Sequence, residues 1–169
     1  MRDNVPVLGV IYAPESDVLY WAVRGHGAFK EVNGETLPIS AMHHEHDQPD
    51  SLVVAISRRQ KLENLTRRLN PAINYELIPL GSSSLKSCLV AEGAADCYVR
   101  LGPTGEWDTG AVHVIVEEAG GKILDSEFTP LSYNQRDTLA NPDFMVMGQA
   151  SIPWPKLIKS RPTERSLTA

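Results

Sequence analysis

The sequence contains no long uninterrupted run of apolar residues. No segment approaches the roughly 18 residues that a membrane-spanning helix needs. The first residues, MRDNVPVLG, lack the charged, apolar and cleavage-site regions of a secretory signal. We therefore expect a cytosolic protein.

Cysteine is scarce. Cys88 and Cys97 form neither a CxxC metal pair nor the pattern of a disulfide framework, so we predict that both are reduced. Cys88 stands near Leu85 and Leu89 at helical spacing. This spacing favours a buried structural thiol over a nucleophile.

Positive charge is also sparse. The formal net charge is −5, and the longest basic runs are the pairs Arg58–Arg59 and Arg67–Arg68. Nucleic acid is therefore not expected as a partner. The 169 residues are 42% hydrophobic and 22% charged, which is typical of a globular chain with one domain or two small lobes.

Residues 1–41 predict an antiparallel meander. Runs of β-branched and aromatic residues predict four strands, at 5–13, 17–23, 27–32 and 35–40. The last two flank Asn33-Gly34, a strong hairpin signal. Because the first strand is apolar on both faces, we expect it to be buried on both sides or to have a further neighbouring strand.

Residues 51–148 predict an α/β lobe. Strands are expected at 52–56, 75–80, 96–101, 122–125 and 144–147, and helices at 59–69, 82–92 and 107–119. In the first of these helices Leu62, Leu65 and Leu69 should face inward. Residues 149–169, with three prolines and scattered charges, predict a loose tail.

The connector between the two regions holds His43, His44 and His46, beside Glu45 and Asp47. These residues suggest a transition-metal site. A solvated loop is the favoured interpretation, because the sequence offers no second ligand cluster.

The segment GEWDTGAVHVIVEEAGG, residues 105–121, predicts a helix with an acid on its apolar side. At roughly 100° per residue, Asp108 shares the apolar arc with Trp107, whereas His113 falls on the polar side and should be exposed. A carboxylate facing a core must be neutral or paired. Asp108 is either an N-cap for the amides two or three residues on, or a Mg²⁺ ligand, or both.

Four other positions are candidate ligand contacts. Gly81-Ser82-Ser83-Ser84 opens a helix directly after a strand, where free amides and hydroxyls favour an anion. Lys86 follows as a phosphate contact or a solvated surface lysine. Ser57-Arg58 and Arg100 end two other strands, at positions where α/β folds bind ligands.

Together these motifs resemble the inositol monophosphatase superfamily of Mg²⁺-dependent, lithium-sensitive phosphatases. The strongest match is WDTGAVHVIVEEAGG, which is similar to the C-terminal signature of that superfamily. The bisphosphate nucleotidases within it are similar in three further stretches, PVLGVIYAP (6–14), GSSSLKSCLVAEGAADCYVRLGPTGEWDT (81–109) and LANPDF (139–144). The resemblance covers residues 5–147.

The resemblance implies a fold and an activity. The fold is the C-terminal part of the layered α/β/α/β/α sandwich of the sugar phosphatases. The activity is Mg²⁺-dependent hydrolysis of a small nucleotide bisphosphate, 3′-phosphoadenosine 5′-phosphate, to AMP and phosphate, in sulfur assimilation. The location is cytoplasmic, with peripheral association with the inner membrane left open.

The resemblance also assigns site residues. Asp108 matches a C-terminal aspartate that binds metal, lies close to the substrate and takes part in catalysis. Positions near the nucleotide pocket are matched by Ser57, Gly81, Ser82, Lys86 and Arg100.

The chain departs from the family pattern in its acidic motifs. Family members carry a metal-binding glutamate and an Asp-Pro-x-Asp-Gly-Thr motif upstream of PVLGVIYAP, and this chain has neither. A single carboxylate is a poor Mg²⁺ site. We therefore expect a C-terminal segment with little or no phosphatase activity of its own.

Two partners are possible for this chain: a missing N-terminal half, or a second copy that binds through an exposed strand edge. Two alternative functions also stay open. One is a non-catalytic nucleotide-binding or interaction module. The other is an inositol or sugar phosphatase of the same superfamily.

Overall fold

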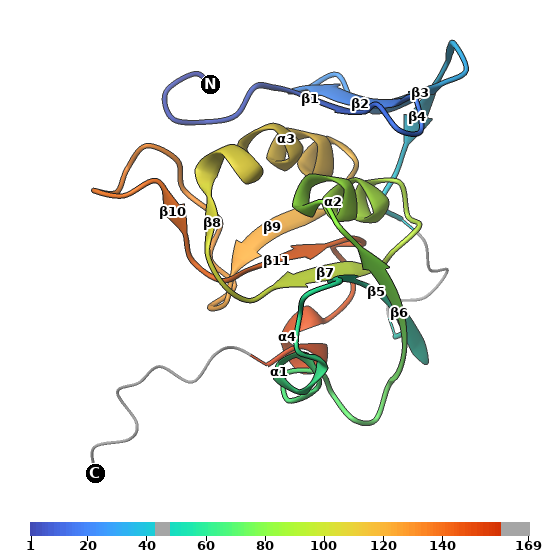
Figure 1. Cartoon of the computed structure of the whole chain (residues 1–169), viewed down its shortest axis with the longest axis vertical. Helices are drawn as coiled ribbons and strands as arrows, with labels where there is room; N and C mark the ends of the chain where they lie inside the picture. Colours follow the sequence, from blue (N-terminus) through green and yellow to red (C-terminus); the bar gives the residue numbers. More distant parts are fainter. Residues whose placement is uncertain (43–47, 160–169) are drawn as a thin grey trace.

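The computed structural model describes residues 1–42 and 48–159, so the cluster of His43, His44 and His46 lies outside the described residues. An antiparallel sheet, two helices, a mixed sheet and two short helices follow one another as layers (Figure 1). This is the mixed α/β architecture that the sequence predicts. Within the described ranges, no helix has the length and apolar character needed to cross a membrane.

The first sheet is the predicted meander. Its strands pair in chain order, and they are β1 (Leu8–Ala13), β2 (Val18–Val23), β3 (Ala28–Val32) and β4 (Glu35–Ile39). All three pairings are antiparallel. The hairpin between β3 and β4 turns at Asn33 and Gly34, which both have positive φ, as the sequence signal requires.

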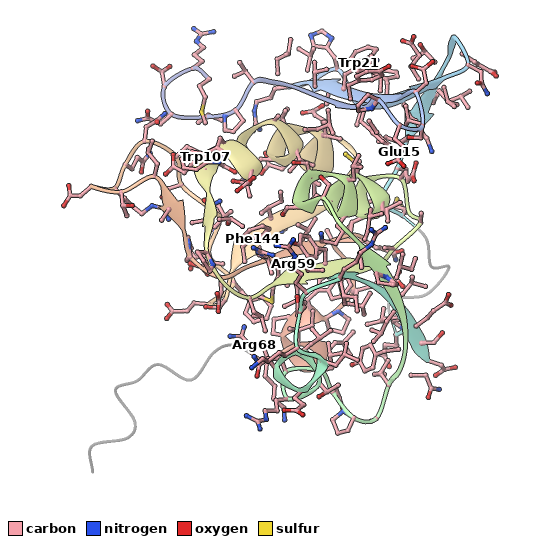
Figure 2. The ribbon with its side chains drawn as sticks, in the orientation of Figure 1. Glu15, Trp21, Arg59, Arg68, Trp107 and Phe144 are labelled. Carbon is pink, nitrogen blue, oxygen red and sulfur yellow. The ribbon has the colours of Figure 1, made fainter. Side chains whose placement is uncertain are left out.

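Strand β1 is buried on one face only. Leu8, Val10 and Tyr12 on the outer face are 57%, 50% and 54% exposed. Trp21 and Phe29 stack on that same outer face, with ring centroids 4.4 Å apart (Figure 2). Within residues 1–42 and 48–159, no second layer covers this outer face, and β2 is the one strand that pairs with β1.

The second sheet has the strand order β6-β5-β7-β11-β9. The strands are β5 (Ser51–Ser57), β6 (Asn74–Leu80), β7 (Cys97–Arg100), β9 (Lys122–Asp125) and β11 (Phe144–Met147). Strand β5 pairs in parallel with both β6 and β7, while β11 is antiparallel to β7 and β9. The C-terminal ends of β5, β6 and β7 therefore meet at one edge.

Two helices fill the space between the sheets (Figure 1): α2 (Ser83–Ala91) and α3 (Gly110–Glu118). Helix α3 is apolar around most of its circumference, and its buried side chains include Val112, Val114, Ile115 and Val116. A helix of this kind has to be covered on every side. Gly9 allows the close approach of β1, because a Cβ there would meet the Ala111 carbonyl and lie 2.8 Å from Val114 Cγ1.

Both cysteines are free, as predicted, and both are buried, which the sequence predicted for Cys88. Cys88 belongs to α2 and Cys97 begins β7. Burial raises the pKa of each thiol above its ordinary value, which leaves the neutral, unreactive form.

The helix predicted at 59–69 is shorter in the structure. Helix α1 spans Leu62–Thr66, and Leu62 is 49% exposed rather than inward, whereas Leu65 and Leu69 are buried as predicted. Leu69 forms an isolated antiparallel bridge with Ile158, three residues after the end of the helix.

The predicted loose tail is packed from Gln149 to Lys159. This segment contains α4 (Trp154–Leu157), and the side chains of Ile152, Trp154 and Ile158 are buried beneath the second sheet. Trp154 Nε1 donates a hydrogen bond to the Gln149 carbonyl at 3.0 Å. The prolines indicate a loose segment, but the apolar side chains between them form part of a core.

His113 is buried, not exposed as the helical periodicity predicts. The loop after β9 brings Tyr133 over that side of α3, and His113 Nδ1 lies 2.7 Å from the Tyr133 hydroxyl. His113 Nε2 lies 3.2 Å from Glu117 Oε1, and Arg24 Nη2 donates to Glu117 Oε2 at 2.7 Å. This network joins the meander to α3.

Because of this network, the free energy of unfolding should decrease at acid pH. The hydrogen bond from His113, together with its charge and that of Arg24, lowers the pKa of Glu117 from 4.5 to about 2. A lowered carboxyl pKa stabilises the fold above pH 4.5, and this contribution disappears as the pH falls toward 2. Glu117→Gln should therefore lower the free energy of unfolding at pH 7, with a smaller decline between pH 4.5 and pH 2.5.

Urea unfolding at stepped pH measures this effect. Glu63→Gln, an exposed acid of α1, is the matched control and should follow the wild type. If the free energy of unfolding of Glu117→Gln fell with pH in parallel with that of the wild type, the network would not contribute to the acid dependence of stability.

Candidate functional site

A cavity of about 530 Å³ lies where β5, β6 and β7 end. Ser57 ends β5 and the next three residues follow that strand, Gly81 follows β6, and Arg100 ends β7. Sequence-distant residues meet here because the three strands are parallel. The edge at the carboxyl ends of parallel strands is the common ligand position in α/β folds.

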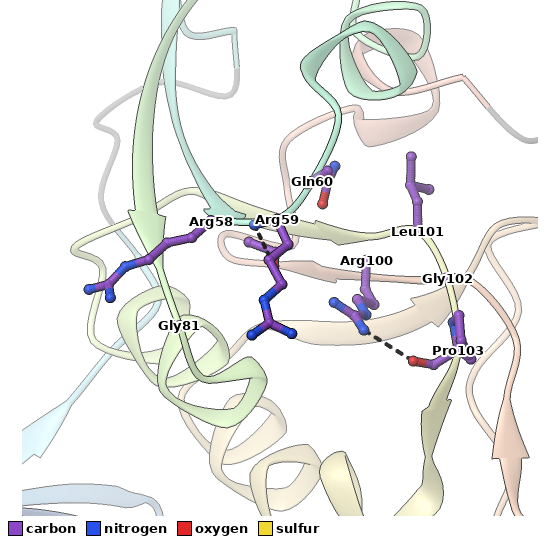
Figure 3. Close-up of a pocket in the computed structure, with 9 residues that line it drawn as sticks. Arg58, Arg59, Gln60, Gly81, Arg100, Leu101, Gly102 and Pro103 are labelled. Carbon is purple, nitrogen blue, oxygen red and sulfur yellow. Dashed lines mark hydrogen bonds between the residues drawn. The ribbon is translucent and has the colours of Figure 1, made fainter.

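The cavity is positively charged. Arg58, Arg59 and Arg100 line it, and none of its lining residues is acidic. The side chains of Arg59 and Arg100 extend in the same direction, whereas Arg58 points away from both (Figure 3). Arg100 Nη2 donates to the Pro103 carbonyl at 3.0 Å, which orients its guanidinium group. Arginines arranged in this way suit a phosphate group.

Lys86 is not a solvated surface lysine. Its side chain is 1% exposed, and Nζ donates to the carbonyls of Leu80, Gly81 and Ser82 at 3.2, 3.3 and 2.7 Å. Burial, and secondarily Arg100, lowers its pKa to about 8. All three donors of the ammonium group are therefore used to fix the turn between β6 and α2.

The serine-rich turn caps α2 and reaches toward the Asp108 segment. Ser82 is the N-cap, and its Oγ accepts from the Leu85 amide at 3.2 Å. Ser84 Oγ donates to the Asp108 carbonyl at 3.3 Å. The start of α2 thus touches both the strand-end cavity and the second candidate segment.

Asp108 belongs to a short turn that precedes α3. The turn consists of β8 (Thr104–Gly105) and a 3₁₀ helix, η1 (Glu106–Asp108). Asp108 is partly buried, and its Oδ2 accepts from the Gly105 amide at 2.9 Å. It therefore caps the amide three residues before it, not those that follow. The three-residue turn also rotates Trp107 outward, where it is 74% exposed instead of sharing an apolar arc (Figure 2).

Two residues that the sequence analysis did not single out hold this turn in place. Asn141, in β10 (Ala140–Asn141), donates from Nδ2 to the Gly105 carbonyl at 2.7 Å and to Thr109 Oγ1 at 3.1 Å. Glu106 accepts from the Asn134 amide at 2.9 Å and from Arg136 Nη2 at 2.8 Å. One signal for Asn141 was present in the sequence, since it lies within the matched stretch LANPDF.

The structure brings some of the predicted residues together and keeps others apart. Ser57, Gly81 and Arg100 line one cavity, Ser82 and Lys86 shape the turn beside it, and Asp108 lies on the adjacent turn outside the cavity lining. Arg59 and Gln60 line the cavity but were not predicted. They directly follow Ser57-Arg58, so the same strand-end argument would have included them.

The described residues do not complete a metal centre. Within residues 1–42 and 48–159 there is no group of three or more His, Cys, Asp or Glu side chains able to hold a metal ion. Asp108 Oδ1 accepts no hydrogen bond from any described residue, so Asp108 can provide one ligand. One carboxylate is fewer than the donors that Mg²⁺ needs beyond water and phosphate.

Two curated relatives match most of the sequence of this chain. Both are called 3′(2′),5′-bisphosphate nucleotidase CysQ, and they are from Aggregatibacter actinomycetemcomitans and Haemophilus influenzae. The first is 41% identical over 95% of this chain and 59% of the relative, the second 44% over 91% and 56%. The chain therefore spans somewhat more than half the length of the curated relatives it matches.

A solved structure and a family profile lead to the same assignment. The crystal structure of CysQ from Bacteroides thetaiotaomicron, a bacterial member of the inositol monophosphatase family, superposes with a TM-score of 0.73. It is 36% identical, over 87% of this chain and 59% of that one. The profile of the inositol monophosphatase family matches residues 1–159. The chain belongs to the inositol monophosphatase family.

Proposed function

We propose that this chain provides the nucleotide-binding lobe, and one metal ligand, of a 3′(2′),5′-bisphosphate nucleotidase that converts 3′-phosphoadenosine 5′-phosphate to AMP and phosphate. The observation that carries the proposal is the cavity at the ends of β5, β6 and β7, which is lined by three arginines and no acid. A substrate with two phosphate groups needs such a surplus of positive charge. The shared name of the two curated relatives supports the same substrate class.

The proposal divides the work between this chain and additional acidic ligands. Asp108 offers one carboxylate for a Mg²⁺ centre, beside the start of α2. A bound Mg²⁺ would supply charge stabilisation at the phosphate and an activated water. Lithium sensitivity would belong to that completed centre. Since the described residues supply a single carboxylate, the chain by itself should bind nucleotide without hydrolysing it.

The β1 edge is the proposed contact for another strand. Strand β1 contains no charged residue, and among the described strands only β2 pairs with it. The opposite edge, β4, carries Glu35 and Pro38, which disfavour pairing. The partner is the complementary part of the enzyme or, in its absence, a second copy of this chain.

Phosphate release tests the catalytic part of the proposal. The 169-residue chain with Mg²⁺ and 3′-phosphoadenosine 5′-phosphate should release no phosphate above background. A chimera that adds the portion of the Haemophilus influenzae relative lying outside the match should be active. In that chimera Asp108→Asn should lower kcat by about 10²–10³-fold, the loss typical of removing one group that stabilises charge in the transition state.

The exposed Asp137→Asn is the matched control for the chimera and should keep full activity. Circular dichroism checks that both variants are folded. Robust turnover by the unmodified chain would contradict its inactivity, and near-normal turnover by the Asp108→Asn chimera would reduce Asp108 to a structural cap.

Lys86 should act on nucleotide binding through the turn it holds. Lys86→Met removes the donor of three carbonyl hydrogen bonds, and we expect the free energy of unfolding to fall by about 1–3 kcal/mol. Amide hydrogen exchange at residues 81–84 should accelerate, and AMP affinity measured by calorimetry should fall with it. The exposed Lys122→Met is the control. Lost affinity with unchanged stability and exchange would instead make Lys86 a direct phosphate contact.

Sedimentation velocity tests the β1 edge. We expect the chain to dimerise as its concentration rises, because β1 presents an apolar row beside unpaired backbone groups. Val10→Lys should shift the equilibrium to monomer, while Leu62→Lys, an equally exposed position on α1, should not. A wild-type chain that stays monomeric at all concentrations would exclude self-association through this edge.

A further inference from the structure

The side-chain amide of Gln60 makes no hydrogen bond to any described residue. Its Nε2 and Oε1 atoms are both shielded from solvent, and neither has a hydrogen-bond partner in the described part of the chain. An unpaired buried polar group costs about 1–3 kcal/mol. Such a cost points to a functional position, because a purely structural glutamine would be replaced by an apolar side chain without loss.

Gln60 stands where a ligand would reach it. It lines the strand-end cavity, in the loop that leads from β5 to α1 (Figure 3). Because both terminal atoms are shielded from solvent, the side chain has to change rotamer before its amide can contact a ligand in the cavity. The volume of about 530 Å³ falls within the usual range for small-molecule sites.

The other lining residues separate into apolar and cationic groups. Leu101 and Pro103 offer apolar surface, and a Cβ added at Gly81 or Gly102 would meet no atom within 4 Å, so the backbone leaves open space. Arg100 adds a second unpaired group, since its Nε is buried without a partner among the described residues. A flat apolar base with an attached phosphate matches this combination.

We propose that Gln60 recognises the nucleobase, with Nε2 donating to a ring nitrogen and Oε1 accepting from an exocyclic amino group, while Arg59 and Arg100 hold a phosphate of the same nucleotide. A donor and an acceptor side by side match the amino group and the adjacent ring nitrogen of adenine. They do not match the two adjacent acceptors, N7 and O6, of guanine. The inference rests on the proposed function and names the residue that selects the base.

Binding to the metal-free 169-residue chain tests the inference. The ligands are AMP and purine riboside 5′-monophosphate, which lacks only the amino group. The wild type should bind AMP at least about 10-fold more tightly, since leaving a polar group of the site unpaired is costly. Gln60→Leu should abolish this preference for AMP. Arg59→Met should weaken the binding of both nucleotides and keep the preference.

Stability gives an independent measurement. Without ligand, Gln60→Leu should unfold at the same or a higher temperature than the wild type, because the substitution removes an unsatisfied buried amide. Gln135→Leu, at an exposed glutamine, is the matched control and should change neither stability nor preference.

The possible failures are distinguishable. If both nucleotides bind but Gln60→Leu retains the preference for AMP, Gln60 does not recognise the base and the proposed function stands. A lower unfolding temperature for Gln60→Leu would assign the amide a structural role and overturn the inference. If neither nucleotide binds to the wild type, the proposed function fails together with it.

Discussion

The enclosure of α3 between two sheets is the constraint on which the rest of the structure depends. Val112, Val114, Ile115 and Val116 leave this helix without a solvated face, so it requires the meander on one side and the mixed sheet on the other. Gly9 permits the close contact with β1. Because α3 is fixed on both sides, the turn that precedes it, with Asp108 at its end, is held against the start of α2.

Buried polar groups then fix the site to this scaffold. The ammonium group of Lys86 binds three carbonyls of the turn after β6, and Asn141 binds the turn that carries Asp108. Groups of this kind are costly to bury unless they are fully bonded. Their hydrogen bonds therefore specify one backbone path for both turns. Asn141 keeps one buried atom without a partner, Oδ1, whereas both terminal atoms of Gln60 lack a partner among the described residues.

The division of labour in the site follows from charge. The cavity at the strand ends collects arginines and excludes acids, while Asp108 stands on the neighbouring turn as a single carboxylate. An anionic nucleotide and a divalent cation need opposite charges, and the fold provides them on adjacent segments. Among the described residues, basic side chains suited to phosphate are therefore more numerous at the site than carboxylates suited to a metal ion.

Periodicity and turn chemistry in the sequence determined most of the secondary structure, including the hairpin at Asn33-Gly34 and the strands at 122–125 and 144–147. These features depend on near neighbours in the chain. Only the tertiary structure decided that Tyr133 covers His113, that Ile158 pairs with Leu69, and that parallel strands gather Ser57, Gly81 and Arg100 around one cavity. Each of these outcomes depends on a contact between residues far apart in sequence, which no local pattern encodes.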